Sequence, residues 1–157
     1  MKHEHGYAVK VVWTGNRGSG TSGYQAYSRD HEIRGEWKAA MIAGTSDPAF
    51  RGDGARWNPE ELLVSTLASC HMLWYLHLAA EAGVVVERYE DDASGVMVTD
   101  SDGCGRFTGA TLRPKVTVRA GADVEMAMRL HERAHQLCFI ANAVNFAVRC
   151  EPEVFAG

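Results

Sequence analysis

An almost uninterrupted run of apolar residues from position 62 to position 82 is the strongest pattern in the chain. Asn58 ahead of the run is a good helix N-cap, Pro59 suits a first helical position, and Gly83 is a natural helix stop. The pattern predicts a helix over residues 58–83. Because this helix is apolar nearly all round, we expect it to be central and covered on most sides. A core helix is preferred to a membrane span because polar side chains interrupt the run, namely Ser65, Thr66, Ser69, His71 and His77.

Shorter segments with alternating or β-branched residues predict strands on both sides of this helix. Before it we expect strands at residues 7–13, 24–29 and 31–37, with loops at 14–23 and 44–57. After it we expect strands at residues 84–100 and 107–120 around a turn at 101–105, a helix at 123–142 and a strand at 144–150. This order predicts the α+β class. No repeat or linker divides the chain, and residues 1–157 suit a single domain.

Charge and cysteine content narrow the function. The net charge is −4 with acidic and basic residues interspersed, so no basic stripe for nucleic acid is present. The first residues lack the apolar core of a signal peptide, and we expect a cytoplasmic protein without membrane attachment. Cysteines in such a chain are expected to be free, catalytic or metal-bound rather than joined in a disulfide framework. The four are Cys70, Cys104, Cys138 and Cys150.

Two of these cysteines fall on the two predicted helices, Cys70 in the middle of the first and Cys138 near the end of the second. A thiol in the middle of an apolar helix is expected to be inert, so a reactive Cys70 needs a cation or hydrogen-bond donors from elsewhere. Arg17 in the Gly-rich loop could supply a guanidinium, and Glu60 could orient it through a two-point carboxylate pair. The same residues could equally be a solvated loop cation and a helix-start charge. Spacing alone does not decide between these interpretations.

Three segments resemble signatures of the OsmC/Ohr family of osmotically inducible and organic hydroperoxide resistance proteins. NPEELLVSTLASC, ending at Cys70, is similar to the first signature, an Asn-Pro-Glu helix start followed ten residues after the Glu by a peroxide-reacting cysteine. AHQLCFIANA around Cys138 is similar to the second, in which Ala-His precedes the resolving cysteine and Asn-Ala follows. TGNRG around Arg17 resembles the family's arginine-bearing loop. Two helical motifs at this separation make the resemblance specific.

The resemblance implies a fold and a mechanism. The implied fold is antiparallel sheets packed around two central helices, in an intertwined homodimer with active sites near the subunit interface. Cys70 would attack an organic hydroperoxide, or hydrogen peroxide, and become a sulfenic acid that Cys138 resolves as a disulfide. An external dithiol, such as a lipoylated protein, would reduce that disulfide. Arg17 would stabilise the Cys70 thiolate and Glu60 would hold Arg17, and no cofactor is implied.

The chain departs from the peroxidase branch of this family beside each cysteine. His71 follows Cys70 where that branch has an aromatic residue, and Phe139 follows Cys138 where it has Pro. The departures indicate a less characterised OsmC-like branch. They also motivate an alternative function, a small-molecule-binding or redox-sensing protein with little peroxidase turnover. For His71 itself, packing in the core and a role beside the thiol both stay open.

The sequence His-Glu-Arg-Ala-His, which ends at His135, matches the H-E-x-x-H pattern of zinc metalloproteases. Zinc held by His131, His135 and Cys138 is chemically feasible, because all three are good zinc ligands. A charged residue inside the motif and the lack of a convincing downstream ligand weigh against it, and His135 also fits the family signature. We therefore expect no metal, with His131 exposed, Cys150 in the core and Cys104 in an exposed turn.

Overall fold

The computed structural model describes residues 2–157, which form two compact units that divide between Leu62 and Leu63. The first unit holds an antiparallel sheet in the order β1-β2-β3, made of β1 (Lys10–Trp13), β2 (His31–Arg34) and β3 (Ile42–Gly44). β1 and β2 confirm two expected strands in shortened form, whereas β3 was not expected. A 3-10 turn, η1 (Pro48–Phe50), lies within the expected polar loop.

The strand expected at residues 24–29 is wrong, because this segment forms a turn followed by bends and irregular backbone. The Arg29 guanidinium donates to the carbonyl oxygens of Tyr24 and Tyr27, each at 2.9 Å. It also lies over both rings, 4.3 Å from the Tyr24 centroid and 4.2 Å from the Tyr27 centroid. Main-chain carbonyls that serve a cation in this way are not available for a strand ladder.

The long helix α1 (Pro59–Glu81) confirms the strongest prediction from the sequence. A reciprocal cap starts it: the Glu61 amide donates to Asn58 Oδ1 at 2.8 Å, and the Asn58 amide donates to Glu61 Oε2 at 3.2 Å. Gly83 follows the last turn with a φ of 70°, a conformation that glycine adopts without strain.

Only one face of α1 is buried, and the expectation that it is covered on most sides is wrong for the described chain. The buried positions recur every four residues, at Leu67, His71, Tyr75 and Ala79. Leu73 on another face is 63% exposed. The helix is long and apolar enough to cross a membrane by length and composition, and its buried row packs inside the second unit.

Strands in the second unit form two three-stranded sheets, ordered β4-β7-β9 and β5-β6-β8. These are β4 (Val86–Asp91), β5 (Ser94–Thr99), β6 (Gly105–Leu112), β7 (Pro114–Val118), β8 (Ala147–Cys150) and β9 (Glu153–Ala156). The turn expected at 101–105 joins β5 to β6, and β9 was not expected.

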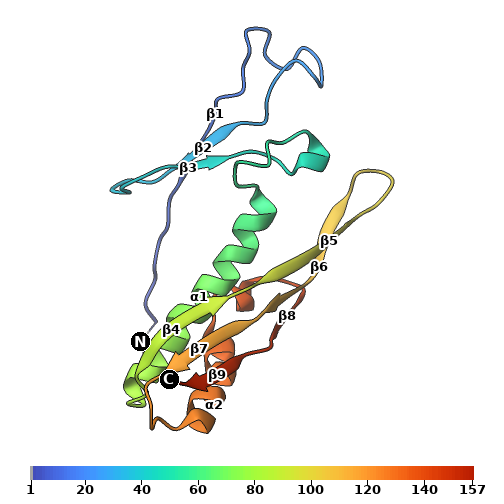
Figure 1. Cartoon of the computed structure of the whole chain (residues 1–157). Helices are drawn as coiled ribbons and strands as arrows, with labels where there is room; N and C mark the ends of the chain where they lie inside the picture. The colour runs from blue at the N-terminus through green and yellow to red at the C-terminus, as the bar shows by residue number, and fades with distance from the viewer. Residues whose placement is uncertain (1) are drawn as a thin grey trace. The chain divides into compact units, whose positions relative to one another are not determined.

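The two sheets share one register and form two halves of one long ribbon (Figure 1). Antiparallel pairing ends in one half with Asp91 opposite Pro114 and resumes in the other with Ser94 opposite Thr111, without a slip. The third strand runs parallel to the middle one, and its residues pair with residues 38 positions earlier in both halves.

Prolines interrupt the ladder where the halves meet. Pro114 and Pro152 have no amide hydrogen to donate, so the ribbon breaks at the same level in the middle and third strands. Asp91 compensates by accepting the Arg113 amide at 2.7 Å, and the Glu151 amide donates to the Leu112 carbonyl at 2.9 Å. Along the middle strand, every second residue is buried on both sides of the break, and this alternation is not shifted at Pro114. The buried residues are Ala110, Leu112, Pro114, Val116 and Val118.

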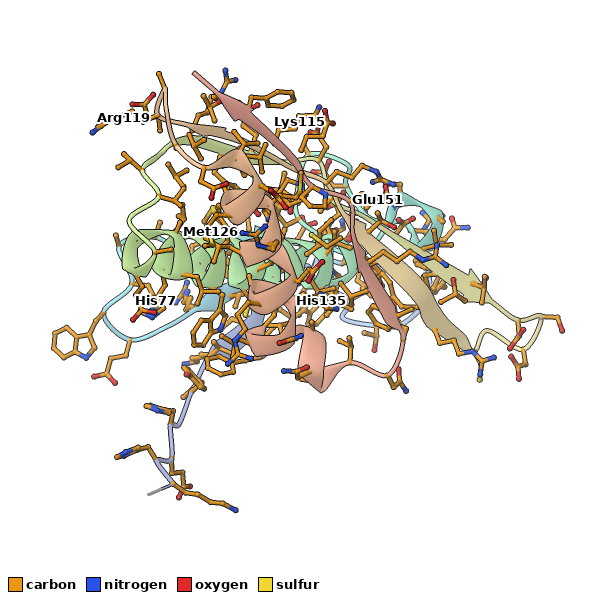
Figure 2. The ribbon with its side chains drawn as sticks, turned by 90° about the horizontal axis from the view of Figure 1, so that it is seen from below. His77, Lys115, Arg119, Met126, His135 and Glu151 are labelled. Carbon is orange, nitrogen blue, oxygen red and sulfur yellow. The ribbon has the colours of Figure 1, made fainter. Side chains whose placement is uncertain are left out.

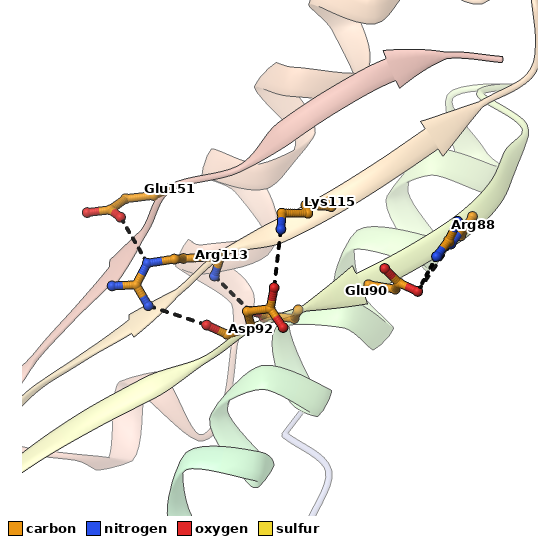
Figure 3. A network of polar contacts seen from close by, with 7 residues as sticks. Arg88, Glu90, Asp92, Arg113, Lys115 and Glu151 are labelled. Atoms are coloured by element: carbon orange, nitrogen blue, oxygen red, sulfur yellow. Dashed lines mark hydrogen bonds and ion pairs between the residues drawn. The ribbon is translucent and has the colours of Figure 1, made fainter.

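Exposed ion pairs cover the outer side of this break (Figure 3). Lys115 Nζ lies 3.2 Å from Asp92 Oδ2, and Arg113 Nε lies 3.4 Å from Glu151 Oε2. Arg113 also donates to the Ser94 hydroxyl at 2.8 Å. Exposed pairs of this kind contribute about 0–1 kcal/mol each, so they fix side-chain positions more than they stabilise the fold.

The second helix, α2 (Val124–Leu137), lies across α1 (Figure 2). Its N-cap is Asp123, as expected, whose carboxylate accepts the Met126 amide at 2.9 Å. It ends about five residues before the expected end, because Cys138 is the C-cap with an extended backbone of φ −66° and ψ 107°. A 3-10 turn, η2 (Ala141–Ala143), follows.

The α+β class is confirmed, with mixed rather than purely antiparallel sheets. The homodimer and the single-domain boundaries stay predictions.

Candidate active site

Cys70 lies on the partly exposed side of α1, on the wall of an apolar pocket. Helical spacing of three and four residues places neighbouring α1 side chains on this side with it. The loop after α2 supplies the opposite wall. The pocket has a volume of about 550 Å³ and is lined by Thr66, Ser69, Cys70, Leu73, Trp74, His77, Phe139 and Ile140.

Aromatic contacts order the outer part of this pocket. The ring of Trp74 meets the ring of Phe139 edge to face, with centroids 5.4 Å apart. Trp74 also meets His77 edge to face at 5.8 Å, and His77 Nε2 lies 3.5 Å from Glu81 Oε1. Phe139 is 67% exposed. The pocket therefore offers a large apolar surface next to a thiol.

Cys138 brings a second thiol to the same place. Its side chain is buried, its Sγ accepts the Ala141 amide at 3.4 Å, and its thiol is close enough to the Cys70 thiol for the two to interact electrostatically. Burial is the main cause that raises the pKa of Cys138 to about 11, and the nearby Cys70 raises it further. Both cysteines are free thiols. The structure thus brings together the two cysteines that the sequence singled out.

Arg17 and Glu60 are not joined in the described chain. Arg17 is exposed in its loop, and no ion pair between it and Glu60 is present among residues 2–157. Glu60 is half-buried, and its Oε2 is a buried acceptor without a hydrogen-bond partner in that part of the chain. The expected pairing of Arg17 with Glu60 stays a prediction.

His71 points to the buried side of α1, away from the pocket side that carries Cys70. Its Nε2 lies 3.0 Å from His131 Nδ1, with the two rings nearly coplanar at 7°, so the two imidazoles share a hydrogen bond. Cys150 Sγ lies 3.5 Å from the same Nε2. Tyr75 stacks on His131 with centroids 3.9 Å apart. Of the two interpretations left open for His71, the structure favours a hydrogen-bonded core residue.

Burial keeps this cluster uncharged at neutral pH. Desolvation, and then the nearby His135, lower the pKa of His71 to about 4. Desolvation, and then His71, lower the pKa of His131 to about 3. Burial, and then the carboxylates of Asp91 and Glu151, raise the pKa of Cys150 to about 12.

The structure corrects the expectation for the H-E-x-x-H motif. His131 is 2% exposed, so the expectation that it is a surface residue is wrong. The donor atoms that gather within 4.8 Å of one another come from His71, His131 and Cys150, not from the expected alternative set with His135 and Cys138. Cys104 is exposed, as expected. There was no reason in the sequence to expect His71 and Cys150 in this cluster, except that histidine and cysteine can both bind metals.

Comparison with known proteins identifies one matching family pattern and one sequence relative. The pattern of the family described as OsmC-like protein matches residues 52–153. An uncharacterised protein of Bacillus subtilis, YmaD, is 23% identical over 154 residues, which are 96% of this chain and 93% of the relative.

Solved structures share the fold over nearly the whole chain. An OsmC-like protein of unknown function from Vibrio cholerae is 30% identical, with a TM-score of 0.86 over 96% of this chain and 100% of the other. The organic hydroperoxide resistance protein OhrB of Bacillus subtilis is 22% identical, with a TM-score of 0.61 over 95% of this chain and 98% of the other.

Proposed function

The chain belongs to the OsmC-like protein family, and on that basis we propose that it is a thiol-dependent peroxidase that reduces organic hydroperoxides. The observation that carries the proposal is the nearness of two free thiols, Cys70 at the wall of the apolar pocket and the buried Cys138 beside it. Two neighbouring free thiols are the arrangement from which a reversible disulfide can form. Organic hydroperoxide resistance proteins share this fold, which supports a peroxide-related function.

In the proposed reaction the Cys70 thiolate attacks the terminal oxygen of the hydroperoxide. The O–O bond breaks, the alcohol leaves after taking a proton, and Cys70 becomes a sulfenic acid. Cys138 then attacks the sulfenic sulfur, water leaves, and a Cys70–Cys138 disulfide forms. An external dithiol, such as a lipoyl group on a partner protein, returns both thiols by exchange. The balance is one hydroperoxide and one dithiol converted to one alcohol, one water and one disulfide.

Arg17 and Glu60 complete this proposal. A guanidinium close to Cys70 would stabilise the thiolate and polarise the peroxide. Glu60 would hold this guanidinium. Its Oε2 is buried and has no hydrogen-bond partner within residues 2–157, so this oxygen is an acceptor available to the guanidinium.

A homodimer is proposed on the same basis. Leu73 and Phe139 expose apolar surface beside the pocket, at 63% and 67%. A second copy that packs near this surface would exclude water from the reacting thiols. The cytoplasmic setting is also a proposal, supported by four cysteines that are all free.

The test follows peroxide loss from cumene hydroperoxide with dihydrolipoamide, using wild type, Cys70→Ser and Cys138→Ser. Cys104→Ser is the matched control, because it removes an exposed thiol that does not line the pocket. We expect turnover in wild type and in Cys104→Ser, none in Cys70→Ser, and a trapped sulfenic acid at Cys70 in Cys138→Ser. Wild-type turnover no faster than that of Cys70→Ser, with both thiols reduced at the start, would contradict the proposal.

A second candidate function is a small-molecule-binding or redox-sensing protein with little turnover. One observation favours it: Cys138, with its pKa raised to about 11, is a protonated thiol at neutral pH and so a slow nucleophile. This alternative predicts one round of Cys70 oxidation, or retention of an apolar ligand, without repeated peroxide consumption.

A further inference from the structure

A cluster of side chains able to bind a metal lies on the buried face of α1, next to the face that carries Cys70. It is made of His71 from α1, His131 from α2 and Cys150 from β8. His71 and His131 are 0% and 2% exposed, and Cys150 is half-buried on the inward side of its strand. One side chain from each of three separate elements therefore meets at one point of the core.

Polar atoms around this point have no partners within residues 2–157. The buried atoms include His71 Nδ1, His131 Nε2 and His135 Nδ1. The hydroxyls of Tyr75 and Tyr89 belong to the same neighbourhood, because Tyr75 stacks on His131 and lies 5.9 Å from Tyr89 between ring centroids. A buried polar atom without a partner is destabilising. His71 Nδ1 and His131 Nε2 are the ring nitrogens on the far side from the His71–His131 contact. The far-side nitrogens are thus free for a hydrogen bond to a further polar group, as the second nitrogen of a metal-binding histidine usually makes, while the facing nitrogens converge with Cys150 Sγ.

Two of the three donor separations in the cluster are close to those of a tetrahedral site, and the third, between His131 and Cys150, is within 4.8 Å. Zn–N bonds of about 2.0–2.1 Å and Zn–S bonds of about 2.3 Å place donor atoms about 3.3 Å (N to N) and about 3.6 Å (N to S) apart. The observed separations are 3.0 Å between His71 Nε2 and His131 Nδ1, and 3.5 Å between His71 Nε2 and Cys150 Sγ. In the hydrogen-bonded arrangement the two rings face each other edge to edge. A metal would replace the shared proton, and each ring would turn by about 35° to aim at it.

Ligand chemistry selects the class of ion. Two imidazoles and a thiolate favour a borderline or soft ion such as Zn²⁺, whereas Mg²⁺ and Ca²⁺ require oxygen donors. His135 lies one turn after His131, with its ring centroid 6.5 Å from that of His71. Its unpartnered Nδ1 places a further nitrogen donor near the cluster.

We propose that His71, His131 and Cys150 form a structural zinc site that joins α1, α2 and β8. The site is distinct from the Cys70–Cys138 pair, because His71 is on the buried face of α1 and Cys70 is on the face that lines the pocket. An ion held from three elements stabilises their packing by binding the folded state in preference to the unfolded one. The proposal does not depend on peroxidase activity.

The test uses the full chain without an affinity tag, stripped with a chelator and then loaded with Zn²⁺ or Co²⁺ alone. We expect about one Zn²⁺ per chain by mass spectrometry, and a thiolate-to-cobalt charge-transfer band in the wild-type Co²⁺ form. Zn²⁺ is also expected to raise the melting temperature of the stripped protein. These measurements on the wild-type chain test the site even where a variant does not fold.

Variants then identify the ligands. Cys150→Ser should abolish the charge-transfer band and weaken Zn²⁺ binding by roughly 100-fold or more, whereas Cys104→Ser should change neither. Replacement of both His3 and His5 by Ala removes the N-terminal imidazoles as a competing site and should leave the band intact. No binding to the stripped wild-type chain would overturn the proposal and leave a hydrogen-bonded histidine pair. A band that survives in Cys150→Ser but is lost in Cys138→Ser would also overturn it, in favour of the set with His135.

Discussion

Leu67 and Leu73 lie on the same helix and allow a matched test of how α1 is buried. Leu67 is 0% exposed and packs with Ala110 and Leu112 in the core of the β5-β6-β8 half. Truncation of such a leucine to alanine removes its transfer free energy and leaves a cavity, at a loss of about 3–5 kcal/mol in the free energy of unfolding. Leu73 is 63% exposed, and the same truncation there should change this free energy by no more than about 0.5 kcal/mol within one chain.

The assay is urea unfolding of wild type, Leu67→Ala and Leu73→Ala at several protein concentrations. Leu67→Ala should lower the stability equally at every concentration, and a loss of 3 kcal/mol corresponds to a melting temperature roughly 6–12 °C lower. If a second copy covers Leu73, Leu73→Ala should lower the free energy of unfolding by an amount that depends on protein concentration, because the truncation then weakens association. A large loss in Leu73→Ala that is independent of concentration, or a loss below about 1 kcal/mol in Leu67→Ala, would refute the single buried face.

Three further predictions follow from local contacts. Asn58→Ala removes the reciprocal cap of α1 and should lower the free energy of unfolding by about 1–2 kcal/mol in urea titrations, whereas Asn58→Asp, which keeps an acceptor, should lose far less. Cys138, with its pKa raised to about 11, should be alkylated by iodoacetamide at pH 8 much more slowly than the exposed Cys104. The difference between the two alkylation rates should narrow as the pH rises toward 11. Equal rates at pH 8, measured by peptide mass spectrometry, would contradict the burial of Cys138. His71 and His131 have pKa values lowered from 6.5 to about 4 and about 3, so their neutral forms contribute stability that is fully present above pH 6.5 and lost as pH falls through 4 to 3. In chelator-treated protein, the free energy of unfolding should fall by roughly 3 kcal/mol from the protonation of His71 alone. A free energy of unfolding that does not change between pH 6.5 and pH 3 would show that the two histidines are not buried in their neutral forms.

Local signals in the sequence were sufficient to place the two helices, whereas Cys70 and Cys138 were singled out by their resemblance to family signatures. The cap at Asn58, the stop at Gly83 and the cap at Asp123 act within a few residues, and each appears where it was expected. Cys70 and Cys138 were identified by motifs on two helices. Their nearness depends on where α2 ends, and the chain leaves the helix at Cys138 itself.

Features that depend on distant residues could not be predicted. His71 and His131 are 60 positions apart, and each on its own has the pattern of a core or surface histidine. The turn at residues 24–29 follows from the contacts of Arg29 with two carbonyls, which compete with a segment of otherwise strand-like composition. The last strand, β9, is short, and it is a strand only because it pairs with β7, which lies far away in the sequence.

The shared register of the two ribbon halves has a consequence for insertions and deletions. Inward-facing positions of the third strand alternate through the proline break, at Val148, Cys150, Pro152 and Val154. Although Glu151 is exposed beside the break, removing this one residue would turn every later side chain to the opposite face. This surface segment between β8 and β9 should therefore tolerate substitution but keep a constant length among functional variants, unlike an ordinary loop.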